Sequence, residues 1–340
     1  MALVINGRCL LRPVGGVERY TRMLLEAAGR SSPDVRVVVP AKGGAPQGLP
    51  SGSNVERRGR MSGHAWEQVI LPQALEAGDL LLSPANTGPL RVRRQLLVVH
   101  DLAFLHHPEW FDLRFARWYG FLMPRLVRRC AGVITVSGTM REELMRTFAL
   151  KADRVHVVPP FAMDLPRPVP VGVDPGFHLF IGADDPRKEV HRGLDLLLQA
   201  DPRATAVVVG RQRRSFSRTP AFEHPQVTLL PDVTDAQLAW LYDHARCLVH
   251  PSVYEGFGLP VLEALHRGCP VVARPLPVLE ELFGDAVHAC AFRDPADLAD
   301  VFRRIPPRNE PHAPHPVADT FHRDRAVRAL HRAIMSVDRT

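Results

Sequence analysis

Short apolar runs alternate with stretches of helical period along most of this chain, and that alternation constrains the fold more than any other feature. In the first half the strand-length apolar runs are Ala2–Ile5, Val35–Val39, Leu80–Leu82, Leu96–Val99, Gly132–Val136 and Val155–Val158. Between several of them apolar residues recur with helical spacing, as in Val17–Ala28 and Phe111–Val127, and Ser137 is placed to cap a helix over Arg141–Phe148. Buried strands that alternate with helices predict a parallel sheet covered on both faces.

The alternation breaks at the proline-rich residues 161–176 and then begins again, which marks these residues as a linker. The next predicted strands are Phe177–Ile181, Ala204–Val209, Val227–Leu230, Cys247–His250 and Pro270–Ala273. The helices predicted between them are Glu189–Gln199, Asp235–His244 and Pro260–Arg267. A chain of 340 residues suits two domains of about 150–170 residues each.

We therefore predict an α/β fold of two Rossmann-like, doubly wound parallel-sheet domains that face a central cleft. Ligands bind at the carboxyl ends of parallel strands, so both halves could offer loops to that cleft. The predicted parts, in chain order, are an N-terminal domain over 1–163, a linker over 164–176, a C-terminal domain over 177–316, and a last helix over 317–338 that packs back onto the first domain.

The composition excludes several classes of protein. Hydrophobic residues at 46% and charged residues at 23% are inconsistent with wholesale disorder. No apolar stretch approaches the ~18 residues of a membrane span, and the start of the chain lacks the pattern of a signal peptide, so we expect a cytoplasmic protein. Without any CxxC spacing, buried free thiols are expected at the five cysteines Cys9, Cys130, Cys247, Cys269 and Cys290.

The strongest local signal is the string HPSVYEGFGLPVLEALHRGCPVVA at 250–273. It is typical of a buried strand, a glycine-rich turn, a helix that ends before Gly268, and a second strand. Glu255 falls in the loop before the helix and Glu263 near its first turn. A carboxylate can accept hydrogen bonds from two adjacent hydroxyls of a ribose or hexose, and the amides at a helix start favour a phosphate. Taken alone, Glu255 would be read as a cap of the turn and Glu263 as a solvated side chain.

This string resembles the E-x7-E signature of the family 4 glycosyltransferases, which are retaining, nucleotide-sugar-dependent enzymes with the two-domain GT-B fold. The resemblance covers nearly the whole chain. Further similar blocks, in the family's order, are 5–27 with its glycine loop, VVHDLAFLHHPEWF at 98–111, GVITVSGTMREEL at 132–144 and FIGADDPRKEVHRGLDLLL at 180–198. The block at 98–111 looks like a subgroup of bacterial mannosyltransferases and related hexosyltransferases.

The resemblance implies a role for each matching residue. Glu255 would accept hydrogen bonds from the donor sugar and Glu263 from the ribose, while Arg187 and Lys188 would neutralise the diphosphate. His100 would contact the reacting sugar, with Asp101 beside it. The glycines that would let the backbone approach the diphosphate are Gly15 and Gly16. The donor-binding turn would also include Gly256, Phe257, Gly258 and Leu259.

The chain departs from the family pattern at three places. Glu189 stands where the family often has Asn after the Arg-Lys pair. The glycine loop reads VGGV, whereas related sequences commonly carry Thr before the glycine. In RPLPVLEELF at 274–283, Glu280 or Glu281 takes the place of a Pro-Glu pair that follows a serine-containing turn. No departure removes a carboxylate or cation that the chemistry needs.

No metal cofactor is expected, because the sequence shows no DxD-type motif and no histidine spacing typical of metal ligands. The resemblance implies front-face attack with retention, in which the leaving phosphate helps to deprotonate the acceptor. The predicted function is transfer of a hexose from a nucleotide diphosphate sugar, first GDP-mannose and then UDP-glucose or UDP-GlcNAc, to a hydroxyl of a glycan, lipid-linked sugar or small molecule. The alternatives are a natural-product glycosyltransferase using a UDP-sugar, a sugar-nucleotide epimerase, and a non-catalytic sugar-nucleotide-binding protein.

The net charge of +7 is concentrated in the first half of the chain. Residues 1–165 carry 22 Lys and Arg against 14 Asp and Glu, and residues 166–340 carry 21 against 22. No run of five or six basic residues appears, so nucleic-acid binding is not expected. By the family architecture the basic half is the acceptor domain. We therefore hypothesise attraction to an anionic acceptor or a membrane surface through Arg91, Arg93, Arg94, Arg125, Arg128 and Arg129.

Overall fold

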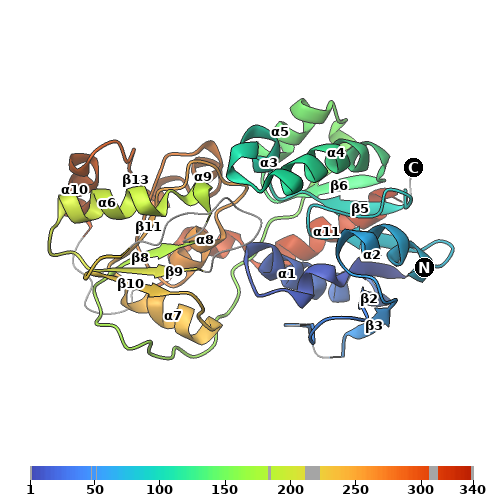
Figure 1. Cartoon of the computed structure of the whole chain (residues 1–340), viewed down its shortest axis with the longest axis horizontal. Coiled ribbons are helices and arrows are strands. Elements are labelled where there is room, and N and C mark those ends of the chain that lie inside the picture. The colour runs from blue at the N-terminus through green and yellow to red at the C-terminus, as the bar shows by residue number, and fades with distance from the viewer. Residues whose placement is uncertain are drawn as a thin grey trace. The chain divides into compact units, whose positions relative to one another are not determined.

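A computed structural model describes residues 2–46, 48–50, 52–182, 185–210, 223–305 and 313–337. The chain forms two compact units, each built around its own sheet (Figure 1). Unit 1 comprises the described residues of Met1–Leu102, Arg117–Phe161 and Phe321–Thr340. Unit 2 comprises the described residues of Ala103–Ala116 and Ala162–Thr320. The predicted boundary at 163 did not anticipate that residues 103–116 pack with unit 2.

Unit 1 contains a seven-stranded parallel sheet with the order β3-β2-β1-β4-β5-β6-β7. Its strands are β1 (Leu3–Asn6), β2 (Val35–Pro40), β3 (Asn54–Arg58), β4 (Leu80–Ser83), β5 (Gln95–Val98), β6 (Gly132–Thr135) and β7 (Val155–Val157). The chain moves outward from β1 to β3 and then returns to place β4 on the other side of β1. This reversal between β1 and β4 is the switch point of a doubly wound sheet.

The main helices of unit 1 are α1 (Gly16–Ser31), α2 (Gly63–Val69), α5 (Gly138–Phe148), α11 (Arg323–Val337) and most of α4 (Leu113–Arg129). Ser137 caps α5, accepting a hydrogen bond from the backbone N–H of Met140, as the sequence predicts. The last helix α11 packs against α1, where Arg323 forms an ion pair with Glu26.

Unit 2 contains a six-stranded parallel sheet with the order β10-β9-β8-β11-β12-β13, so its switch point lies between β8 and β11. Its strands are β8 (His178–Ile181), β9 (Ala206–Val209), β10 (Val227–Leu230), β11 (Cys247–His250), β12 (Val271–Ala273) and β13 (His288–Ala289). Its helices are α3 (Ala103–His106), α6 (Val190–Ala200), α7 (Asp235–His244), α8 (Leu259–His266), α9 (Pro277–Phe283) and α10 (Pro295–Arg304). The predicted parallel α/β architecture is confirmed in both units.

The buried strands supply the core of each unit. All residues of β1, β4, β5 and β6 are buried, which explains their continuous apolar runs. All five cysteines are buried, as predicted, and none of them forms a disulfide. Among the described residues, no helix is both long enough and apolar enough to cross a membrane.

Candidate functional site

The strongest cluster of predicted site residues lies at the switch point of unit 2, where loops follow the carboxyl ends of β8 and β11. The loop after β8 turns through Gly182, whose φ of +101° lies in the left-handed region that favours glycine. Its described end is a single 3-10 turn over Pro186–Lys188. The loop after β11 runs from Pro251 to Gly258 and leads into α8.

Lys188 and Glu255 form an ion pair between these two loops. The same carboxylate oxygen, Oε1 of Glu255, accepts a hydrogen bond from Ser252 Oγ at 2.8 Å and lies 3.0 Å from His250 Nε2. The Glu255 side chain is 9% exposed, so it depends on these partners for the solvation that water would otherwise give. Burial alone would raise the pKa of Glu255, but the charge of Lys188 and the contact with His250 outweigh it and hold that pKa well below its usual range.

The backbone also joins the two loops. The carbonyl of Arg187 accepts hydrogen bonds from the N–H of Val253 at 2.8 Å and from Ser252 Oγ at 3.2 Å. The predicted Arg-Lys pair and the predicted glutamate therefore belong to one rigid arrangement, although 67 residues separate Lys188 from Glu255.

Arg187 is paired within its own loop. Its guanidinium binds both carboxylate oxygens of Asp185, with Nε 2.9 Å from Oδ1 and Nη2 2.5 Å from Oδ2. Asp185 also caps the 3-10 turn by accepting a hydrogen bond from the N–H of Arg187 at 3.1 Å. The positive charge of Arg187 is therefore balanced by Asp185.

The sequence interpretation missed Asp185, His250 and Ser252. His250 and Ser252 both lie within the singled-out string, and a polar residue at the end of a buried strand was a usable signal. Asp185 stands two residues before Arg187, a spacing that suits a cap on the following turn.

Glu263 lies on α8, and it is only 8% exposed. The hydroxyl of Tyr242 donates a hydrogen bond to its Oε2 at 2.9 Å. The helix begins at Leu259 after Gly258, so Glu263 lies in the second turn rather than the first. The predicted end of this helix is confirmed, since Gly268 follows the cap residue Arg267 with a φ of +64°.

The turn between Glu255 and α8 is anchored by its apolar side chain. Phe257 is 5% exposed and its ring packs edge-on against Phe283 of α9, with centroids 5.9 Å apart. Its side chain holds the turn in place, so any donor contact from Phe257 would come from its backbone. Gly256 is buried beside it, and the half-buried Leu259 is the first residue of α8.

The remaining predicted residues lie in unit 1. Gly15 is the extended residue before α1, and Gly16 is the exposed first residue of that helix. His100 follows β5; its Nε2 lies 2.7 Å from the carbonyl oxygen of Pro84, and its backbone N–H donates to Asn86 Oδ1 at 2.8 Å. A carbonyl only accepts, so Nε2 carries the hydrogen. Burial lowers the pKa of His100, which keeps the ring neutral.

Asp101 is half-buried next to His100. Its charge acts against burial and partly restores the pKa of that imidazole. Within the described residues, no group of three or more His, Cys, Asp or Glu side chains could hold a metal ion. The absence of a metal cofactor stays a prediction.

Two family models match consecutive parts of the chain. The model described as Glycosyltransferase Family 4 matches residues 14–162, and the model described as Glycosyl transferases group 1 matches residues 165–310. The chain belongs to the family 4 glycosyltransferases. The two matches meet at the proline-rich segment that the sequence marks as a linker.

Several characterised relatives of this family 4 member are named mannosyltransferases. It is 28% identical to the O-antigen chain mannosyltransferase RfbU of Salmonella typhimurium, over 60% of this chain and 58% of that protein. It is 31% identical to the O-antigen chain mannosyltransferase B of Escherichia coli, over 58% of this chain and 57% of that protein. The chain thus matches less than two thirds of the length of these relatives.

Solved structures with similar folds are also glycosyltransferases. The sucrose-phosphate synthase of Thermosynechococcus elongatus superposes with a TM-score of 0.64 at 19% identity, covering 99% of this chain and 94% of that one. WaaG, a glycosyltransferase involved in lipopolysaccharide biosynthesis, superposes with a TM-score of 0.63 at 15% identity, covering 100% and 96%. These likenesses confirm the predicted GT-B fold.

Proposed function

We propose that this protein transfers a hexose, with mannose from GDP-mannose as the first candidate, to a hydroxyl of a glycan, lipid-linked sugar or small-molecule acceptor. The observation that carries the proposal is the Lys188–Glu255 pair at the switch point of unit 2, at the entrance to α8. The names of the O-antigen relatives support the choice of mannose and of a polysaccharide acceptor.

The contacts of Glu255 suit recognition of a sugar. Lys188, Ser252 and His250 all approach Oε1, and no described residue makes a hydrogen bond to Oε2. Because the carboxylate stays ionised, Oε2 can accept hydrogen bonds from the hydroxyls of a donor hexose. Glu263, held by Tyr242, is proposed to accept from the ribose of the nucleotide in the same way.

Lys188 is proposed to stabilise the leaving nucleoside diphosphate. The Lys188 side chain is 12% exposed and its ammonium is held by Glu255, so a diphosphate that arrives beside it finds a preorganised cation. Arg187 and the amides at the start of α8 would add donors, and Gly15 and Gly16 would allow close backbone approach. Preorganised donors of this kind contribute about 3–4 kcal/mol each to lowering a barrier.

Retention of configuration by front-face attack, without a metal ion, is part of this proposal. The neutral His100 ring, with its Nε2–H held on Pro84, is proposed to contact the reacting sugar beside Asp101. The stereochemistry can be read by proton NMR of the anomeric signal of the first product. An inverted anomer would refute retention without refuting transfer.

A UDP-sugar and a soluble acceptor remain the second candidate. A structure that supports this alternative is HepE of Anabaena in complex with UDP and glucose, with a TM-score of 0.63 at 18% identity, covering 100% of this chain and 95% of that one.

Calorimetric titration with GDP and UDP, followed by their hexose conjugates, separates the two candidates. Lys151→Ala is a suitable control for Lys188→Ala, because Lys151 is an exposed lysine of unit 1. If neither nucleotide binds, or if Lys188→Ala binds as well as wild type, the site assignment is wrong.

We also propose a cytoplasmic location with peripheral attachment to the inner face of a membrane. Four exposed arginines precede the adjacent strands β5 and β6 and so lie at the amino edge of the sheet, namely Arg91, Arg93, Arg128 and Arg129. Close to them in sequence, Arg125 covers the ring of Phe121, whose side chain is 47% exposed, at 3.7 Å from its centroid. Arg94 is half-buried and donates to the carbonyl of Gly78 at 3.2 Å, so we remove it from the proposed surface.

Co-sedimentation with phosphatidylglycerol vesicles tests this attachment. Each basic residue near an anionic surface contributes about 1 kcal/mol, so replacing Arg128 and Arg129 with Ala should weaken binding about 30-fold at low salt. The matched control replaces Arg303 and Arg304 of α10, which are also exposed. Equal binding of the two double variants to the vesicles would show that the amino edge of the sheet is not the attachment surface.

A further inference from the structure

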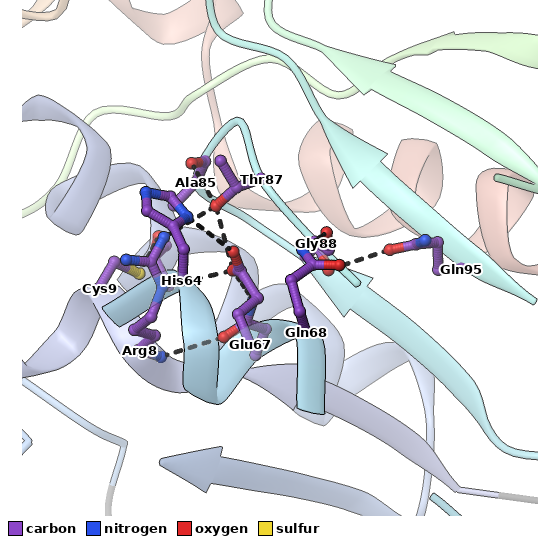
Figure 2. Close-up of polar contacts among 12 residues, drawn as sticks. Arg8, Cys9, His64, Glu67, Gln68, Ala85, Thr87, Gly88 and Gln95 are labelled. Atoms are coloured by element: carbon purple, nitrogen blue, oxygen red, sulfur yellow. Dashed lines mark hydrogen bonds and ion pairs between the residues drawn. The ribbon is translucent and has the colours of Figure 1, made fainter. Parts of the chain in front are cut away.

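A buried polar network occupies the switch point of unit 1, and the family motifs do not include it (Figure 2). Its centre is Glu67 of α2, whose side chain is 1% exposed. Oε1 of Glu67 accepts hydrogen bonds from Asn6 Nδ2 at 2.6 Å, Thr87 Oγ1 at 3.0 Å and Arg8 Nε at 3.3 Å. Asn6 ends β1 and Thr87 follows β4, so the network lies at the carboxyl ends of the two strands between which the sheet reverses.

The switch point of a doubly wound sheet is where such folds bind ligands, because the loops on either side diverge there and leave a crevice. In unit 2 this position holds Lys188 and Glu255. The same position in unit 1 holds Glu67, Arg8 and a histidine, His64.

Glu67 fixes the orientation of His64. Burial by itself would raise the pKa of Glu67, but the charge of Arg8 outweighs it and the pKa is lowered, so the carboxylate is ionised. Its second oxygen, Oε2, lies 3.3 Å from Nδ1 of His64. Because a carboxylate only accepts, Nδ1 carries the hydrogen and Nε2 is left as the other polar atom of the ring. The His64 side chain is 31% exposed, in contrast to the buried glutamate that holds it.

Two aromatic rings of α4 flank His64. The ring of Trp118 lies 5.6 Å from it and the ring of Tyr119 lies 5.8 Å from it, measured between centroids. Trp118 is half-buried, and its indole N–H is buried without a hydrogen-bond partner among the residues that the structure describes. Trp118 therefore offers a ligand its partly exposed ring rather than its N–H.

The network is connected to His100 by one short loop. Thr87 of this loop bonds Glu67, while Pro84 and Asn86 of the same loop hold the ring and the backbone of His100. Asn86 has a φ of +58°, a conformation that Asn tolerates better than most residues. A group bound beside His64 therefore lies one loop away from the histidine proposed to contact the reacting sugar.

We infer that His64 and Trp118 form a recognition subsite for the acceptor sugar, a neutral pyranoside whose hydroxyl donates to Nε2 of His64 and whose apolar face packs on the Trp118 ring. That the bound sugar is the acceptor rests on the proposed function, but the binding of a pyranoside can be measured without turnover. An ion pair that only fastened α2 to the sheet would need Arg8 and Glu67 alone. Such a fastening does not require a partly exposed, oriented imidazole beside a half-buried indole.

The test is a titration of the 15N-labelled chain with the methyl α-glycosides of mannose, glucose, galactose and N-acetylglucosamine, followed at the indole N–H signals. Trp118→Phe assigns the Trp118 signal. Trp66 serves as an internal reference, since its indole N–H donates to the carbonyl of Arg58 at 2.8 Å. We expect at least one glycoside to shift the Trp118 signal to saturation and to leave the Trp66 signal in place.

His64→Gln should weaken this binding about tenfold, the value of one lost hydrogen bond, while His331→Gln should leave it unchanged. His331 is a suitable control because it is an exposed histidine of the same unit. The inference is overturned if no glycoside moves the Trp118 signal, or if His64→Gln binds as well as wild type. Failure of GDP and UDP to bind would instead count against the proposed function, and the glycoside titration would still be informative.

In a transfer assay, His64→Gln should raise the KM for the acceptor about tenfold and leave the KM for the donor and the acceptor-free hydrolysis of the donor unchanged. A general loss of folding would lower all of these together. Equal effects on donor and acceptor would therefore contradict a subsite for the acceptor.

Discussion

Arg274 and Glu189 form an ion pair, with Nη2 of the arginine 2.8 Å from Oε2 of the glutamate. Glu189 is itself a departure from the family's pattern, and Arg274 opens the segment 274–283 that contains another. The other nitrogens of Arg274 donate to the carbonyls of Ala291 at 2.8 Å and Pro251 at 3.2 Å. Arg274 therefore links Glu189, which follows Lys188, to Pro251, which follows His250.

Replacing Arg274 should weaken donor binding without removing a group that touches the donor. We expect Arg274→Gln to reduce the affinity for the nucleoside diphosphate several-fold, because the loops after β8 and β11 lose the guanidinium that contacts both of them. A double-mutant cycle with Glu189→Gln should give a coupling of about 0.5–3 kcal/mol, as found for residues in contact. Calorimetric titration of wild type, the two single variants and the double variant measures this coupling. Strictly additive losses of affinity would show that the ion pair does not hold the site.

Glu189→Asn tests the backbone at the same position. Glu189 has a φ of +43°, which costs a side chain of its type about 1 kcal/mol and which Asn tolerates better. The substitution removes the partly exposed ion pair, worth about 0–1 kcal/mol, so the two effects should nearly cancel in thermal stability. A large loss of stability would mean that the ion pair dominates.

Lys188→Ala should abolish most donor binding. A charge-assisted hydrogen bond contributes about 1.5–3 kcal/mol, so the affinity for the nucleoside diphosphate should fall about 10- to 100-fold. The variant should also shift the acid limb of the pH–rate profile to higher pH, because Lys188 is the main group that keeps the pKa of Glu255 low. An unchanged acid limb in Lys188→Ala, with transfer still measurable, would exclude Glu255 as the titrating group.

His178 should make the stability of unit 2 depend on pH. It is 2% exposed on β8, and burial lowers its pKa to about 4. As the pH falls below about 6.5 the unfolded chain takes up a proton that the folded chain does not, so the stability present at neutral pH is lost on acidification. Between pH 7 and 5 this loss should be about 2 kcal/mol.

Carboxylates also titrate in this range, so the quantity to measure is the difference between wild type and His178→Phe in denaturant unfolding at the two pH values. Phe is of similar size and does not titrate, and the His178 ring already packs 4.7 Å from the ring of Phe302. The same pH dependence in both proteins would show that His178 is not responsible.

Gly258→Ala should disrupt the entrance to α8. Gly258 has a φ of +93°, and a Cβ there would lie 2.7 Å from Cδ2 of Leu279. Left-handed backbone and the clash together should cost about 2–4 kcal/mol. Gly176→Ala is the matched control, since Gly176 has the same φ of +93° but a Cβ there would meet nothing within 4 Å, and it should cost only about 1–2 kcal/mol. Equal losses of stability in the two variants, measured by thermal unfolding, would mean that the contact with Leu279 is relieved at no cost.

Much of the fold was predictable because the elements that carry it have strong local signals. The strands Cys247–His250 and Val227–Leu230 and the helix Asp235–His244 match their predictions residue for residue. The elements that were missed have weak signals. Strand β3, with the polar sequence NVERR, is an edge strand that buries little of its surface, and α2 is a helix of seven residues. The site of unit 1 was missed with α2, because His64 and Glu67 lie on it.

Buried strands and family motifs are properties of consecutive residues, so the two parallel α/β units and the candidates Lys188 and Glu255 were predictable without a structure. Which charges meet is a property of the folded chain. Arg187 is balanced by Asp185, Lys188 by Glu255, Arg274 by Glu189, and the buried Glu67 by Arg8. Three of these pairs join residues 59–85 positions apart. The physical reason is that ion pairing depends on distance in space at a sheet's edge, and spacing along the chain does not encode it.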